Sequence, residues 1–226
     1  MVNAPDFPVC GPAQFLPGTR LLASTTDRMP RTKEVISATL RGIEHALEAV
    51  GVPPTGLRAL GGEPQHHPLG ETYFAEVPFL YGPWMARFSL LPLSPELQAL
   101  RDAPIENAKD SQRDAVSAFF RDLRAPVRWQ LRAQFCRDIE TMPIEDASAA
   151  WSEDDSPWVP VATLEIGPQP GWDEASGQAQ DDRLAFSPWH ALAAHRPLGA
   201  VNRARRAVYA ASQDFRGGFN GCPLHR

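Results

Sequence analysis

The stretch FSPWHALAAHRPLGAVNRARRAVYAASQDFR, residues 186–216, decides the fold that we expect for this chain. Its first part contains two prolines and predicts a loop that ends at Gly199. Neither proline nor glycine follows until Gly217-Gly218, so the intervening residues predict a helix of about four turns. Spacings of three and four place one stripe of side chains along this helix: Val201, Ala204, Arg205, Val208, Tyr209 and Ser212. The stripe is small and apolar except at Arg205 and Tyr209, which lie one turn apart.

The Arg205–Tyr209 pair allows two interpretations. In the first, Tyr209 is an ordinary packed residue, and the aliphatic part of Arg205 lies over it. In the second, Tyr209 is a phenolate that binds a metal ion. A free phenol loses its proton near pH 10, but a neighbouring guanidinium and a ferric ion both favour the charged form. Tyrosinate is one of the axial ligands that proteins offer to haem iron.

The stretch resembles the proximal haem segment of the haem catalases. In that family Phe-x-Pro leads through a loop to Arg-x-x-x-Tyr, whose tyrosine binds the haem iron, and an arginine seven residues later holds a haem propionate. The matching residues here are Phe186-Ser187-Pro188, Arg205, Tyr209 and Arg216. The family's aromatic residue between Arg and Tyr is replaced by Ala207, and its Pro-Asp-Thr-His run after the tyrosine is absent. These departures indicate a remote relative, closer to the small catalase-related proteins than to the large enzymes.

A second match lies in the run MPIEDASAAWSEDDSPWVPVATLEI, residues 142–166. Catalases have a proline-rich crossover with Asp, Trp and Pro at fixed spacing, followed by a strand of the form Pro-x-x-Pro-x-x-x-Leu. The same spacing occurs here without a gap, at Asp146, Trp151, Pro157, Pro160 and Leu164. We expect these residues to build the fold and to carry no chemistry.

The N-terminal segment gives a shorter match. Asn3-Ala4-Pro5 followed by Phe7 resembles the family's Asn-Asn-x-Pro segment, which supplies a distal Asn and a Phe that lines the haem. The match is imperfect, because Val2 and Asp6 stand where the family has Asn and an apolar residue. The family's essential distal His and its partner Ser precede this segment and have no counterpart here.

The composition fits one globular domain. The chain has 226 residues, of which 43% are hydrophobic, and its net charge is −5. This charge gives no reason to expect a nucleic acid or membrane partner, and no apolar run is long enough to span a bilayer. The N-terminus lacks the features of a secretory signal. Three widely spaced cysteines, Cys10, Cys136 and Cys222, predict free thiols and a cytoplasmic location.

The rest of the chain predicts a mixture of helices and strands. Residues 1–29, 51–70 and 168–184 predict loops, and the tail 217–226 is expected to be disordered. Helices are predicted over 33–50 and 110–123, with a helical turn at 97–100; strands are predicted over 71–79, 84–93, 127–138 and 157–166. The polar face of strand 127–138 indicates contact with water or with the inside of a barrel. His66-His67 is interpreted as a solvated pair, with a distal-pocket histidine as the alternative.

The resemblance implies an α+β fold: a partial antiparallel β-barrel of catalase type with about four strands, flanking helices and a C-terminal proximal haem helix. It covers nearly all of the chain but only the second half of a catalase core. Residues 1–226 would then form one catalase-like domain that lacks the family's N-terminal part. Half a barrel has open edges, which favours self-association or a partner chain that completes the barrel.

The function implied by the resemblance is that of a haem-binding, catalase- or peroxidase-type protein acting on hydrogen peroxide. Asn3 and Tyr209 would be catalytic, Phe7, Arg205, Tyr209 and Arg216 would hold the haem, and Tyr209 would bind its iron. Without the distal His, we expect weak activity from this chain alone. Two other functions stay open: a structural or interaction module without haem on the same scaffold, and a haem enzyme for organic hydroperoxides.

Overall fold

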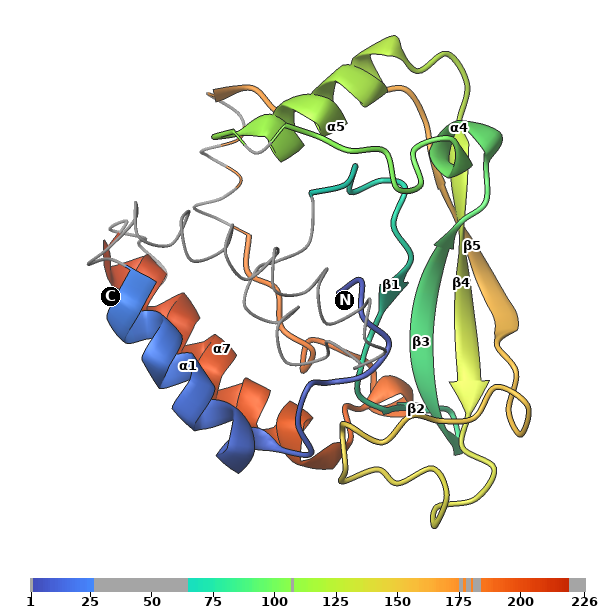
Figure 1. Ribbon diagram of the computed structural model, residues 1–226, viewed down its shortest axis with the longest axis vertical. Helices are drawn as coiled ribbons and strands as arrows, with labels where there is room; N and C mark the ends of the chain where they lie inside the picture. Colours follow the sequence, from blue (N-terminus) through green and yellow to red (C-terminus); the bar gives the residue numbers. More distant parts are fainter. Residues whose placement is uncertain are drawn as a thin grey trace, which may run out of the picture.

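The computed structural model describes residues 2–26, 65–106, 108–174, 177, 180 and 184–219. Its sheet has five antiparallel strands (Figure 1). The strands β3 (Trp84–Pro92), β4 (Val127–Phe135) and β5 (Val159–Ile166) pair in chain order, while β1 (Tyr73–Phe74) and β2 (Phe79–Tyr81) share the other edge of β3. The expected mixture of helices and antiparallel strands is confirmed. The described strands form an open sheet, without closure into a barrel.

The prediction of a single strand over 71–79 is wrong, because the chain bulges between β1 and β2. Phe74 and Phe79 are five positions apart, whereas their partners on β3, Ser89 and Ala86, are only three positions apart. Glu76 lies in the bulge with a φ of 59°, which an extended strand does not allow. The N–H of Ala75 still donates to the Phe88 carbonyl oxygen at 2.8 Å, so the backbone leaves the sheet after Ala75 and rejoins it at Phe79.

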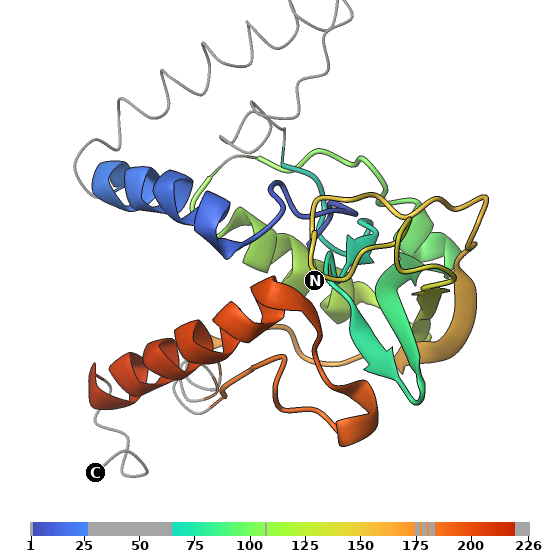
Figure 2. The same cartoon turned by 90° about the horizontal axis from the view of Figure 1, so that it is seen from below.

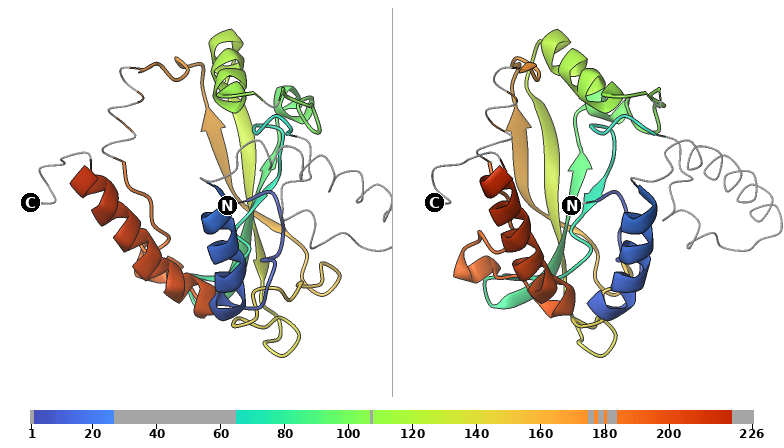
Figure 3. Two further views of the ribbon diagram at one scale, coloured as in Figure 1. Left: turned by 60° about the vertical axis from the view of Figure 1, so that its left-hand side comes forward. Right: turned by 90° about the vertical axis from the view of Figure 1, so that its left-hand side faces the viewer.

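Two helices cover one end of the sheet. The predicted helix over 110–123 is confirmed as α5 (Ser111–Asp122), and the helical turn after Ser94 is α4 (Pro95–Gln98). Figure 3 shows α5 lying across the end of the strands. Burial of apolar surface holds this end together, through a cluster made of Leu97, Phe120, Leu123, Val127 and Trp129.

The prediction that residues 1–29 form a loop is wrong, because residues Pro12–Thr26 form the helix α1. Proline is tolerated in the first turn, and α1 begins at Pro12, but Pro17 and Gly18 lower the helical propensity of the sequence. Tertiary packing compensates for this: the Phe15 ring lies 5.0 Å from the ring of Phe7 in the preceding segment. Helical propensity depends only on residues close in the sequence, so it does not include the contact between Phe7 and Phe15.

The C-terminal helix is confirmed as α7 (Gly199–Phe219). It continues through Gly217 and Gly218 to Phe219, so the expected stop at the glycine pair is wrong. The predicted helix over 33–50 lies outside the described residues, as do residues 220–226 of the tail. No helix in the described part of the chain is long and apolar enough to cross a membrane.

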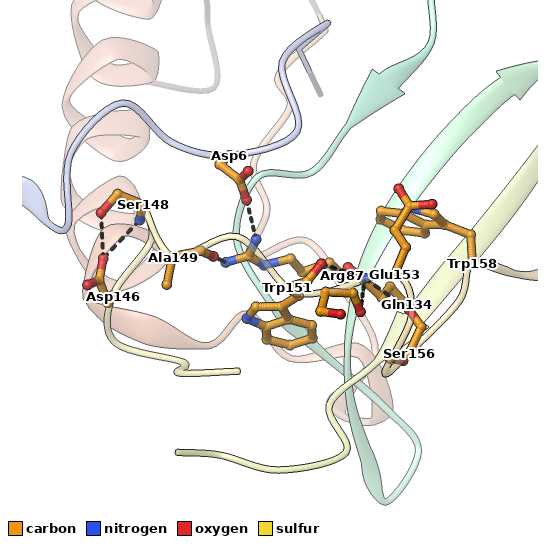
Figure 4. A network of polar contacts seen from close by, with 11 residues as sticks. Asp6, Arg87, Gln134, Asp146, Ser148, Ala149, Trp151, Glu153, Ser156 and Trp158 are labelled. Carbon is orange, nitrogen blue, oxygen red and sulfur yellow. Dashed lines mark hydrogen bonds and ion pairs between the residues drawn. The ribbon is translucent and has the colours of Figure 1, made fainter. Parts of the chain in front are cut away.

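The crossover between β4 and β5 covers one residue on the polar face of β4, Gln134, whereas Gln130 and Arg132 on the same face are half-buried. Gln134 is buried, and its Nε2 donates hydrogen bonds of 3.0 Å to the carbonyl oxygens of Trp151 and Ser156 (Figure 4). In return, Ser156 Oγ donates to the Phe135 carbonyl oxygen at 2.6 Å. Gln134 therefore satisfies two backbone carbonyl groups of the crossover.

Candidate functional site

The start of α7 is fixed to the sheet by backbone geometry and by one buried amide. Gly199 has a φ of 80°, and a Cβ at this position would lie 2.6 Å from the carbonyl oxygen of Ile144. Asn202 is fully buried, and its Nδ2 donates to the carbonyl oxygens of Pro78 and Leu198 at 3.1 and 2.9 Å. The first turn of α7 is thereby anchored beside β2, which sets the direction of the rest of the helix.

One turn further along α7, Arg205 and Tyr209 are joined. Arg205 Nη2 donates a hydrogen bond of 3.0 Å to the Tyr209 hydroxyl oxygen, and the guanidinium carbon lies 5.3 Å from the centre of the ring. Both side chains are half-buried. A cation that donates to the phenol oxygen favours the phenolate over the neutral phenol. The pair thus places a phenol oxygen beside a cation on one face of α7.

Tyr209 and Arg216 line the same cavity, which has a volume of about 400 Å³. We call it the tyrosine cavity; it is bounded by Leu184, Phe186, Val208, Tyr209, Ser212, Gln213 and Arg216. Arg216 is exposed, and its Nη2 donates to the Leu184 carbonyl oxygen at 3.3 Å. A phenol oxygen and a second cation are therefore placed along one wall, seven residues apart on α7.

Arg205 and Phe7 line a second space, a mostly apolar groove of about 510 Å³ between α1 and α7. Figure 2 shows both helices running away from the sheet on the same side of the molecule. This α1–α7 groove is bounded by Phe7, Pro12, Phe15, Leu16, Thr19, Glu76, Val77, Val201, Ala204, Arg205 and Val208. Val208 borders both spaces, while Tyr209 lines only the tyrosine cavity and Arg205 only the groove.

Comparison with known proteins yields matches in structure only, since no family model and no curated protein matches the chain. A fungal catalase aligns over 70% of this chain and 33% of its own length, with a TM-score of 0.53 and 19% identity. Catalase A from Saccharomyces cerevisiae aligns over 73% and 36%, with a TM-score of 0.51 and 16% identity. A bacterial catalase aligns over 99% and 45%, with a TM-score of 0.58 and 15% identity.

The fold is catalase-like. The chain spans less than half the length of each of these catalases, and identities below 20% establish the fold alone. The similarity to catalases that the sequence predicts is thus confirmed for the scaffold.

On this catalase-like scaffold, four of the five predicted site residues lie along α7 and the groove beside it: Phe7, Arg205, Tyr209 and Arg216. Asn3 lies apart from them. It is exposed, next to Val2, whose backbone exchanges hydrogen bonds with Phe74 of β1, and it does not border either space as the described residues define them.

The interpretation of His66-His67 as a solvated pair is wrong for His67. This side chain is buried beside Phe119 of α5, and burial lowers its pKa. His66 lies 3.4 Å from the Glu71 carboxylate. Neither residue borders the groove or the tyrosine cavity, so the alternative of a distal-pocket histidine receives no support.

Sequence reasoning missed two polar residues near the site, Asn202 and Glu76. A buried asparagine three positions before Arg205 is consistent with a helix anchor, but nothing in the local sequence distinguishes it from a surface residue. Glu76 lies in an alternating strand pattern in the sequence, and only the bulge between β1 and β2 brings it to the groove.

Proposed function

We propose that this protein binds haem through Tyr209 and acts on hydrogen peroxide. The observation that carries the proposal is the 3.0 Å hydrogen bond from Arg205 to the Tyr209 oxygen, on the C-terminal helix of a catalase-like scaffold. A phenolate held by a guanidinium is a strong ligand for ferric iron. The described residues contain no group of three or more His, Cys, Asp or Glu side chains suited to a metal ion.

The donor set and the space around it fit a haem. The tyrosine cavity and the α1–α7 groove, of about 400 and 510 Å³, each lie in the range of small-molecule sites. Apolar side chains, among them Phe7 and Val208, form much of the walls and suit the faces of a porphyrin. Arg216 supplies a cation for a propionate carboxylate.

Bound haem would supply a redox-active iron at which peroxide can react. The chain's own residues would set the properties of that iron. Tyr209 would donate electron density as an anionic ligand, Arg205 would keep the phenol ionised, and Phe7 would exclude water from the groove. The resemblance of Asn3-Ala4-Pro5 assigns Asn3 as a hydrogen-bond donor to the peroxide, although Asn3 borders neither space as the described residues define them.

The expected activity of this chain alone is low. Transfer of a proton between the peroxide oxygens needs a general acid–base group, and the loss of such a group typically lowers a rate by roughly 10²–10⁴-fold. No histidine is among the described residues that border the groove or the tyrosine cavity.

Titration of the purified protein with ferric haem tests the proposal. We expect a Soret band and a tyrosinate charge-transfer band in the wild type, and we expect Tyr209→Phe to lose the charge-transfer band. The matched control is Tyr73→Phe, whose hydroxyl donates to the Pro68 carbonyl oxygen away from α7 and should leave the spectrum unchanged. Identical spectra for the wild type and Tyr209→Phe would refute the ligand assignment. If the wild type shows no saturable uptake of haem, the proposed haem-binding function is refuted.

A further inference from the structure

The apolar face of α7 continues beyond the part of the helix that packs against the sheet. Val201, Val208, Phe215 and Phe219 fall on one side of the helix, because spacings of seven and four residues return to the same face. Their exposed fractions rise along α7, from 7% at Val201 to 63% at Val208, 72% at Phe215 and 83% at Phe219. Figure 2 shows that this half of the helix runs away from the sheet. We call Val208, Phe215 and Phe219 the α7 stripe.

Further apolar side chains lie beside the α7 stripe. Phe186 is 76% exposed, and Leu184 is also exposed. Arg216 Nη2 donates to the Leu184 carbonyl oxygen at 3.3 Å, which places the chain before Phe186 against the second half of α7. The rings of Phe215 and Phe219 stack with their centres 6.2 Å apart. Single exposed apolar residues are common on protein surfaces, whereas a contiguous group beside charged residues marks a surface that binds a partner.

The charge of this part of the molecule indicates an anionic partner. The α7 sequence contains one aspartate and four arginines, namely Arg203, Arg205, Arg206 and Arg216. Arg20 is the only charged residue in the sequence of α1, which lines the groove together with α7. The whole chain has a net charge of −5, so positive charge is concentrated on these two helices while the rest of the chain is acidic. The net charge, which by itself gives no reason to expect a membrane partner, does not reveal this separation.

A lipid bilayer with anionic headgroups fits both features. Helices that lie in the plane of a membrane interface combine an aromatic and aliphatic face with arginines around the rest of the helix. This composition is that of α7, and Phe215 and Phe219 line neither the tyrosine cavity nor the α1–α7 groove. Arg216 directly follows Phe215 and is exposed, so its guanidinium can reach a lipid phosphate while the neighbouring ring enters the acyl region.

We propose that α7 docks this protein on the surface of membranes that contain anionic lipids. The helix lies in the plane of the interface, with the α7 stripe among the upper acyl chains and Arg216 at the headgroup phosphates. The acidic remainder of the molecule is held toward the solvent, because the same lipids repel it. This role is separate from the proposed haem function, since Phe215 and Phe219 line neither of the two spaces proposed for haem.

Flotation of the full chain with lipid vesicles tests the insertion of the α7 stripe. One vesicle preparation contains phosphatidylcholine alone, and in the other about 30% of the lipid is phosphatidylglycerol. We expect the wild type to float with the anionic vesicles and to be released by raised salt. Phe215→Ser and, independently, Phe219→Ser should each lower the partition coefficient roughly tenfold, because each removes one phenyl ring from the acyl region. The matched control Trp84→Ser, which removes a 62% exposed ring from the turn between β2 and β3, should have no effect.

Substitution of Arg216 tests the electrostatic part of the proposal. Arg216→Gln should lower the partition coefficient for the anionic vesicles roughly fivefold, because one arginine near an anionic surface contributes about this factor. It should leave the weak partition into phosphatidylcholine vesicles unchanged. The control Arg137→Gln removes an exposed arginine just after the end of β4 and should leave both partition coefficients unchanged.

Two results would overturn the membrane role. The first is a wild type that floats with neither vesicle preparation; sedimentation without lipid would then show whether Phe215→Ser abolishes association between copies, in which case the α7 stripe is a protein contact. The second is flotation that Phe215→Ser and Phe219→Ser lower no more than Trp84→Ser does. Haem takes no part in these measurements, so either result leaves the proposed haem function standing.

Discussion

Arg87 joins the N-terminal segment to the sheet. Its side chain is only 3% exposed; Nη1 lies 2.6 Å from Asp6 Oδ1, and Nη2 donates to the Ala149 carbonyl oxygen at 3.0 Å (Figure 4). Its guanidinium also lies 4.6 Å from the centre of the Trp151 ring. Asp6, which departs from the apolar residue of the catalase pattern, is therefore the counter-ion of a buried arginine. The pair holds the segment that carries Phe7.

Asp6→Asn tests this attachment. Loss of the counter-ion leaves a buried cation with an amide partner, and Asp6 is itself 27% exposed, which moderates the cost. We expect a loss of about 2 kcal/mol in the free energy of unfolding by urea denaturation. The control Asp154→Asn, at an exposed position of the crossover, should change it by less than about 0.5 kcal/mol. Equal effects of the two substitutions would show that the Asp6–Arg87 pair contributes nothing to stability.

At the scale of elements, α7 carries the proposed site and depends on how its first residue is placed. Gly199 combines a left-handed φ with a close approach to the Ile144 carbonyl oxygen. Gly218 lies inside the helix near its other end, and a Cβ at this position would have no described atom within 4 Å beyond its own neighbourhood in the helix. Gly199 thus requires the absence of a side chain, whereas Gly218 does not.

Alanine at the two positions should have opposite effects. Gly199→Ala should cost about 2 kcal/mol or more of the free energy of unfolding, because it adds backbone strain and a steric overlap. Gly218→Ala should be neutral or stabilise by up to about 1 kcal/mol, because alanine has the higher helical propensity. Thermal and urea denaturation provide both values. A tolerated Gly199→Ala would contradict the anchoring of α7 beside β2.

Sequence reasoning predicted correctly those elements whose local sequence pattern agrees with the way they pack in the fold. The strand pattern of β4 and the amphipathic pattern of α5 predicted both elements to within a few residues. It missed α1, where Pro17 and Gly18 argue against the helix that packing with Phe7 favours. It also joined β1 to β2, because alternating side chains do not reveal that Glu76 takes a left-handed conformation. In both cases, the helix α1 and the break between β1 and β2, contacts between residues distant in the sequence determine the structure.

At the scale of the whole molecule, the sheet has an exposed strand at one edge. Within the described residues, β5 pairs only with β4, and its Val159 and Leu164 side chains are 38% and 45% exposed. Unpaired backbone groups beside exposed apolar side chains favour pairing with another chain. Among the described strands, Pro160 on β5 is the feature that limits such pairing.

We therefore expect self-association through β5. Sedimentation velocity at micromolar concentration should find a species larger than the monomer, and Leu164→Lys should shift it toward the monomer, because a charge on an edge strand opposes pairing. Ser152→Lys, on the exposed crossover, is the control and should leave the sedimentation coefficient unchanged. A wild type that sediments as a stable monomer at these concentrations would argue against this surface.

The proposed function depends above all on the binding of haem iron by Tyr209 as a phenolate. Resonance Raman spectroscopy of the haem-loaded protein, excited in the charge-transfer band, tests this bond most directly, because tyrosinate ring modes are enhanced only when the phenolate is bound to the iron. We predict these modes in the wild type, a shift in their frequencies when the protein contains ring-deuterated tyrosine, and their absence in Tyr209→Phe. A haem-loaded wild type without tyrosinate modes, or the same modes in Tyr209→Phe, would contradict the assignment of Tyr209 as the iron ligand.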